Sequence, residues 1–158
     1  HLARGQFEAA SLLFHRAMVL AATGANRECE VLSMRSLARV RMHEGRQPEA
    51  RSVLEYALRA AREVGLREIE AAILRDIADV HVLQENPVQA VNVLDECATL
   101  LRELGSHIEE LAVLQAIVPL LHDEGLDSAK VDTRSRELRG RLANEGVDLA
   151  VASIGVYV

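Results

Sequence analysis

The 158-residue sequence has no tryptophan, and its only other aromatic residues are two tyrosines and two phenylalanines. This scarcity argues against a surface that stacks single-stranded bases, because such a surface needs several exposed rings. Acidic residues also outnumber basic residues: the chain has 24 Asp and Glu but 18 Lys and Arg, and its net charge is −6. An acidic chain is poorly suited to bind a phosphate backbone. We therefore expect no direct contact with nucleic acid.

Long apolar runs and a cysteine framework are missing as well. No uncharged apolar run approaches the roughly 20 residues that a membrane-spanning helix needs. The two cysteines, Cys29 and Cys97, lie far apart, and two thiols do not make a disulfide framework in a chain of this length. The first residues contain neither a signal peptide nor an initiator methionine. These features predict a cytoplasmic fragment of a longer protein that does not enter a membrane.

Motifs that mark catalysis or cofactor binding are absent too. The sequence contains no Gly-x-Gly-x-x-Gly and no Gly-Lys-Ser/Thr phosphate loop. It contains no Cys-x-x-Cys and no His-Glu-x-x-His, which are typical of zinc sites. We interpret Cys97 as a buried small residue, Cys29 as an inert, partly exposed thiol and His81 as a core histidine whose ring is hydrogen-bonded rather than a ligand. We therefore expect no catalytic residue, no metal site and no cofactor, and the chain is not expected to be an enzyme.

The sequence does contain an internal repeat with a period of 40 residues. Such a period is typical of helical repeat arrays. Turn, small, apolar and acidic positions recur at this spacing: Gly5, Gly45, Glu85 and Gly125; Ala10, Ala50 and Ala90; Phe14, Leu54 and Leu94; Ala17, Ala57 and Cys97; Glu30, Glu70 and Glu110.

Each repeat contains two amphipathic helical patterns. In residues 48–64, Ala50, Val53, Leu54 and Ala57 begin an apolar stripe with the i, i+3, i+4, i+7 spacing of one helix face. Proline marks two helix starts, and glycine marks helix ends. These signals predict seven helices and no strand before residue 147: 6–23, 27–44, 48–64, 67–84, 87–104, 107–124 and 128–143.

The repeated residues resemble a known family. Gly5-Gln6-Phe7 with Ala10, Phe14 and Ala17 resembles the second half of a tetratricopeptide repeat (TPR), and Leu37-Ala38 and Ile77-Ala78 resemble the large-then-small pair of its first helix. The period is longer than the usual ~34 residues. This extended variant is similar to the repeats of large LuxR-class bacterial transcription activators and of some animal polarity adaptors. The resemblance implies an all-α, right-handed α-solenoid of antiparallel helix pairs, which we expect over residues 1–146.

The same resemblance implies a peptide groove lined by the first helix of each pair. Arg35 and Arg39 share a helix face, and Arg75 and Asp79 occupy the equivalent positions of the next repeat. Arginine binds carboxylates through two parallel hydrogen bonds. The candidate peptide-binding residues are therefore Arg35, Arg39, Met42, Arg75, Asp79 and Val82, with ordinary solvated arginines as the alternative.

We expect a scaffold or adaptor module that binds a protein or an acidic peptide. The alternative function is an effector-sensing or autoinhibitory regulatory domain of a bacterial transcription activator.

The C-terminal third departs from the repeat. Pro119 replaces a small residue and is expected to bend helix 107–124, because it cannot donate a hydrogen bond to the carbonyl of Gln115. The charged segment 132–141 is interpreted as part of a polar capping helix, with a phosphate-contacting strip as the alternative. The apolar tail 147–158 is interpreted as a short helix over 147–153 with an extended end, the truncated start of a next repeat. Its alternative is an extended strand that docks on a neighbouring chain, and we expect self-association through this tail.

Overall fold

The computed structural model describes residues 12, 19 and 26–149 of the chain. Six α-helices follow one another in this part, and it contains no strand: α2 (Arg27–His43), α3 (Gln47–Glu63), α4 (Arg67–Leu83), α5 (Pro87–Leu104), α6 (His107–Asp123) and α7 (Ala129–Asn144). Their bounds lie within a residue or so of the predicted helices. The predicted all-α fold of repeated helix pairs is therefore confirmed.

Parts of the prediction lie at the chain ends. Of the predicted first helix, Leu12 and Val19 are described, and both are helical; the rest of 6–23 lies outside the described residues. Of the tail, the structure describes 147–149, where Val147 donates its backbone N–H to the carbonyl of Leu142 at 2.9 Å. The predicted helix over 147–153 and its extended end lie mainly outside the described residues.

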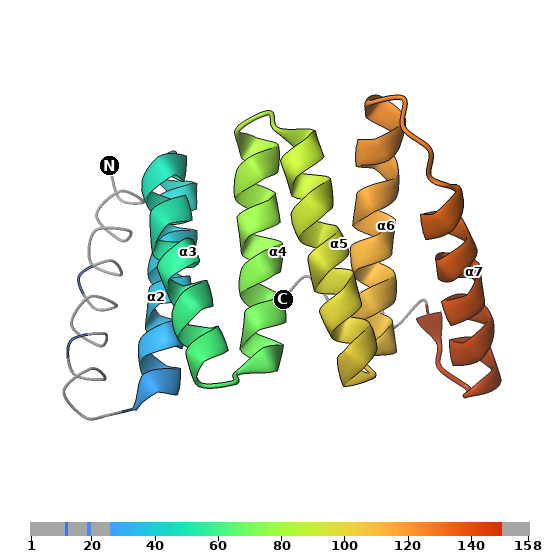
Figure 1. The fold of residues 1–158 in the computed structure, drawn as a ribbon, viewed down its shortest axis with the longest axis horizontal. Coiled ribbons are helices and arrows are strands. Elements are labelled where there is room, and N and C mark those ends of the chain that lie inside the picture. The colour runs from blue at the N-terminus through green and yellow to red at the C-terminus, as the bar shows by residue number, and fades with distance from the viewer. Residues whose placement is uncertain (1–11, 13–18, 20–25, 150–158) are drawn as a thin grey trace. The chain divides into compact units, whose positions relative to one another are not determined.

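The chain divides into two compact units, His1–Glu85 and Asn86–Val158. In the first unit α2 packs on α3, α3 packs on α4, and α2 also contacts α4. In the second unit α5 packs on α6, and α6 packs on α7. Figure 1 shows the helices of each unit joined by short turns, which is the connection expected between antiparallel neighbours.

The turns follow the repeat closely. Gly65 and Gly105 both have φ +72° at the ends of α3 and α5, as predicted from their spacing. This left-handed conformation carries little steric cost for glycine because it has no Cβ. Glu85 takes the same place in the sequence repeat as Gly45 and Gly125, and it is the one non-glycine residue with positive φ, +54°, among the described residues.

Small residues of the repeat are completely buried between the helices. Ala50, Ala57 and Ala90 are fully buried, as is Cys97, which occupies the position of Ala57 in the next repeat. Cys97 is thus a buried small residue, as predicted. Larger apolar side chains such as Leu54, Ile73 and Ile117 fill the rest of the core. Burial of these stripes between neighbouring helices is what stabilises a repeat fold, since no helix pair covers its own stripe.

Candidate functional site

All six predicted peptide-binding residues lie on two neighbouring helices of the first unit. Arg35, Arg39 and Met42 lie on α2, and Arg75, Asp79 and Val82 lie on α4. Arg39 and Val82 are exposed, whereas Arg35, Arg75 and Met42 are half-buried. Because α2 and α4 contact each other and the charges of Arg39 and Arg75 both act on Asp79, we group Arg35, Arg39, Arg75 and Asp79 and call this group the basic face.

Arg35 is engaged within the protein. Its Nε donates to Oδ2 of Asp76 at 2.6 Å, and its Nη2 donates to Oδ1 at 3.4 Å. Asp76 is 8% exposed, so this ion pair joins α2 to α4 with little access to water. Charge-assisted, two-point hydrogen bonds of this kind fix geometry as well as adding energy. Arg35 therefore sets the spacing of the two helices that carry the basic face.

Sequence reasoning missed Asp76. Its repeat equivalents are Ser36 and Ala116, so no recurring carboxylate marks the position. The 41-residue separation between Arg35 and Asp76 is close to the repeat period. That spacing is the one signal that could have suggested a contact between equivalent helices.

Arg39 and Arg75 differ from Arg35, because neither forms an ion pair with a residue that the structure describes. Both guanidiniums nevertheless act on Asp79, where their positive charges lower its pKa. Loss of solvation is the largest influence on this carboxyl, and together with the charge of Asp76 it outweighs the two arginines, so the pKa of Asp79 is raised. The basic face thus presents two guanidiniums whose donors are not used by a carboxylate in hydrogen-bond contact.

Three glutamates recur at the 40-residue spacing, and each accepts a hydrogen bond from an arginine. Glu30 accepts from Arg27 at 2.7 Å and Glu70 accepts from Arg62 at 2.7 Å. Glu110 accepts from Arg102 at 3.0 Å, and its side chain is completely buried. The recurrence of these glutamates in the sequence therefore reflects a structural role at the start of each first helix.

Glu110 has a second partner that the repeat pattern did not predict. Arg134 of α7 donates from Nε to Oε1 at 2.9 Å and from Nη2 to Oε2 at 3.1 Å. Burial by itself would raise the pKa of Glu110, but the hydrogen bonds and charges of Arg134 and Arg102 lower it below its ordinary value. Arg134 stands where Leu54 and Leu94 stand in the other repeats, so this departure from the repeat has a defined structural partner.

Other candidate chemistry is limited in the described part of the chain. His81 is 5% exposed, as expected for a core histidine. Its buried Nδ1 has no hydrogen-bond partner among the described residues, so the prediction that its ring is hydrogen-bonded is wrong for this nitrogen. Cys29 is exposed, and its backbone N–H is capped by the side chain of Asn26 at 3.1 Å. Among the described residues, no group of three His, Cys, Asp or Glu side chains is placed to hold a metal ion. None of the described helices combines the length and apolarity that a bilayer crossing requires.

Comparison with protein families gives one match. The family model of the Suppressor of spindle checkpoint defect 1 C-terminal domain matches residues 44–129. This span begins just after α2, ends at the first residue of α7, and makes up more than half of the chain. No curated protein sequence matches the chain.

Comparison with solved structures gives a match that covers nearly the whole chain. The crystal structure of BtubC (BKLC) from P. vanneervenii is similar to 97% of this chain, with a TM-score of 0.77 and 20% sequence identity. The chain covers 65% of the length of that protein chain. This similarity supports the fold and does not carry function, because the identity is low.

Two crystal structures of TPR-like repeats from a Podosopora anserina protein assigned as a kinesin light chain also match. Their TM-scores are 0.39 and 0.37 at 15% and 14% identity, over 91% and 88% of this chain and 90% of each of those chains. None of the three reported structures is described as an enzyme. These comparisons do not show the expected similarity to LuxR-class regulators.

Proposed function

Because the chain belongs to the family of the Suppressor of spindle checkpoint defect 1 C-terminal domain and folds as TPR-like repeats, we propose that it is a module that binds another protein. Helical repeats bury the faces between neighbouring helices and leave extended surfaces open to a partner. We place the partner site on the basic face of the first unit. The partner chemistry that suits this face is an extended protein segment with acidic side chains.

The observation that carries this proposal is the different use of three neighbouring arginines. Arg35 is bound by Asp76, whereas Arg39 and Arg75 form no ion pair with any described residue. The pairing of Arg35 holds α2 and α4 together, so the two other guanidiniums stand at a defined spacing. Arginine recognises carboxylates through two parallel N–H···O bonds, and the overall charge of −6 makes such a basic face an unusual feature of this chain.

The test is a binding titration with a defined acidic probe. A fluorescent, blocked peptide of six glutamates is titrated with the full chain and followed by anisotropy, and a six-glutamine peptide serves as the neutral control. We expect Arg39→Glu to lower the affinity for the glutamate peptide at least tenfold, because like charges in contact are strongly unfavourable. Arg59→Glu is the matched control, since Arg59 is exposed on α3 and stacks on Tyr56. Equal affinity for wild type and Arg39→Glu would overturn the proposal.

The alternative role as a sensing or autoinhibitory domain of a transcription activator has no observation of its own in the described residues. The tail that was expected to mediate self-association lies mainly in 150–158, outside the described residues, and its role stays a prediction.

A further inference from the structure

The second unit contains a groove that the proposed function does not use. It lies between α6 and α7 and encloses about 420 Å³. Its polar lining comes from Gln115 of α6 and from one face of α7, where four residues follow the i, i+3, i+4, i+7 spacing: Asp132, Ser135, Arg136 and Arg139. A groove of this volume accommodates a few atoms of a side chain together with adjoining backbone.

Ser135 is the unusual residue of this groove. It is 5% exposed, and its hydroxyl has no hydrogen-bond partner among the described residues. Three other hydroxyls within helices behave differently: Ser36, Ser52 and Thr99 each donate to the carbonyl four residues earlier, at 2.9, 3.1 and 3.0 Å. A buried hydroxyl without a partner is costly. Ser135 therefore offers an unused donor at the wall of the groove.

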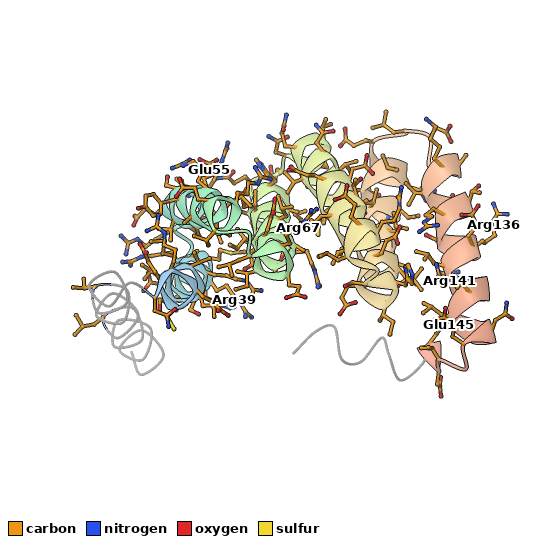
Figure 2. All side chains as sticks on the ribbon, turned by 60° about the horizontal axis from the view of Figure 1, so that its bottom comes forward. Arg39, Glu55, Arg67, Arg136, Arg141 and Glu145 are labelled. Atoms are coloured by element: carbon orange, nitrogen blue, oxygen red, sulfur yellow. The ribbon has the colours of Figure 1, made fainter. Side chains whose placement is uncertain are left out.

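The charges of α7 divide into a paired and an unpaired set. Arg134 is bound by Glu110 and Arg141 by Glu145. Arg136 and Arg139, which line the groove, form no ion pair with a described carboxylate. Figure 2 shows Arg136 projecting from α7 into solvent, and its Nη2 makes one long contact, 3.5 Å, with Oγ1 of Thr133. We assign the direct contact with a ligand to Arg139, and Arg136 adds positive charge at the edge.

The charge of the groove indicates which anion suits it. Its acidic residue, Asp132, already accepts a hydrogen bond from the Ser128 hydroxyl at 2.7 Å. Two guanidiniums and one carboxylate leave a formal charge of about +1, which one ligand carboxylate neutralises, whereas a doubly charged phosphate leaves the groove with a net negative charge.

The α6 side of the groove is formed by Gln115, Val118 and Pro119. α6 is one continuous helix over His107–Asp123 with Pro119 inside it. The donors of the groove, an arginine and a hydroxyl, therefore lie on α7 opposite a partly apolar wall, and this combination suits a peptide side chain that ends in a carboxylate.

We propose that the α6–α7 groove is a second binding site, independent of the basic face, that takes the carboxylate side chain of an extended acidic protein segment through Arg139 and Ser135.

The experiment uses the full ¹⁵N-labelled chain and a blocked pentapeptide with glutamate at its centre, and NMR locates the binding. We expect resonances of Gln115, Ser135 and Arg139 to shift with the glutamate peptide and to stay unchanged with its glutamine counterpart. Arg139→Gln should weaken this binding at least tenfold and Ser135→Ala several-fold. Arg141→Gln is the matched control, because it removes the same charge from an arginine of α7 that is paired with Glu145, and it should retain the affinity.

Several outcomes would overturn the proposal. If Arg139→Gln and Arg141→Gln lowered the affinity for the glutamate peptide equally, the binding would be general charge attraction and not a defined site. Competition by inorganic phosphate at lower concentration than by acetate would show a phosphate site instead. The basic-face variant Arg39→Glu should leave the peptide-induced shifts of Gln115, Ser135 and Arg139 unchanged. Shifts at these three residues therefore test the groove, whereas the effect of Arg39→Glu on peptide affinity tests the proposed function.

Discussion

Arg134 of α7 donates a hydrogen bond to each carboxylate oxygen of the buried Glu110, with donor–acceptor distances of 2.9 and 3.1 Å. The two residues are 24 positions apart, and Glu110 is also bonded to Arg102. A fully buried carboxylate is stable only when its charge and its lone pairs are satisfied. The arginine at a position that is leucine in earlier repeats is therefore a partner of Glu110, and this pairing ties α7 to α6.

Loss of Arg134 should destabilise the second unit. Arg134→Leu restores the residue of the other repeats but leaves Glu110 buried with one arginine fewer. We expect a cost of about 2–3 kcal/mol, below the full cost of breaking a buried pair because Arg134 is partly exposed. Urea unfolding followed by circular dichroism measures it. The double variant Glu110→Leu/Arg134→Leu should recover most of the loss, and a double variant no better than Arg134→Leu alone would contradict the argument.

Two of the three arginines of the basic face, Arg35 and Arg39, should separate an effect on stability from an effect on binding. Arg35→Gln is expected to lower the free energy of unfolding by about 1–3 kcal/mol, because it leaves the buried carboxylate of Asp76 without its partner. Arg39→Gln should change the free energy of unfolding by less than about 0.5 kcal/mol, as is usual at an exposed site. It should lower the affinity for the acidic peptide. Thermal unfolding and peptide anisotropy on both variants check this, and the reverse pattern would refute it.

His81 should make the first unit sensitive to mild acid. Burial is the main cause that lowers its pKa, the charge of Arg51 lowers it further, and Glu55 acts in the opposite direction. The unfolded chain therefore takes up a proton near the ordinary pKa of 6.5, while the folded chain takes it up only at lower pH. The free energy of unfolding should fall as the pH drops from about 6.5 towards the folded pKa.

The matched variant for this effect is His81→Leu, which removes the titrating group. Between pH 7 and the pKa of His81 in the folded chain, the free energy of unfolding of His81→Leu should depend less on pH than that of the wild type. NMR titration of the His81 ring gives the folded pKa directly. A ring that titrates at or above the value of an unfolded peptide would contradict the prediction.

The turn at Glu85 offers a stabilising substitution. Its φ of +54° is unfavourable for a residue with a Cβ. Glu85→Gly should therefore stabilise the chain by up to about 1 kcal/mol, after allowance for the greater freedom of glycine in the unfolded state.

Gly125→Ala is the counterpart at the equivalent position of the next repeat. An added Cβ there meets no atom within 4 Å, so its expected cost of about 1 kcal/mol comes from the φ of +66° alone. Urea unfolding of both variants compares the two effects, and the same sign for both would count against the explanation.

The sequence by itself determined the helices, their bounds and the repeat. The apolar stripes, the turn glycines and the prolines act within a few residues along the chain, so the 40-residue period and the burial of Ala57 and Cys97 followed from local spacing. It also placed Arg35, Arg39 and Arg75 on the first helices of consecutive repeats, because equivalent positions in a repeat occupy equivalent places.

Only the tertiary structure decided which of these charges are used. Arg35 turns to Asp76 on α4 and Arg134 turns to Glu110 on α6, and these partners are 41 and 24 residues away. Helical periodicity shows which residues share a face, but an ion pair depends on the angle and distance between two packed helices. The packing therefore gives Arg35 and Arg134 carboxylate partners on a neighbouring helix. Among the described residues, it gives no such partner to Arg39 on α2, Arg75 on α4 or Arg139 on α7.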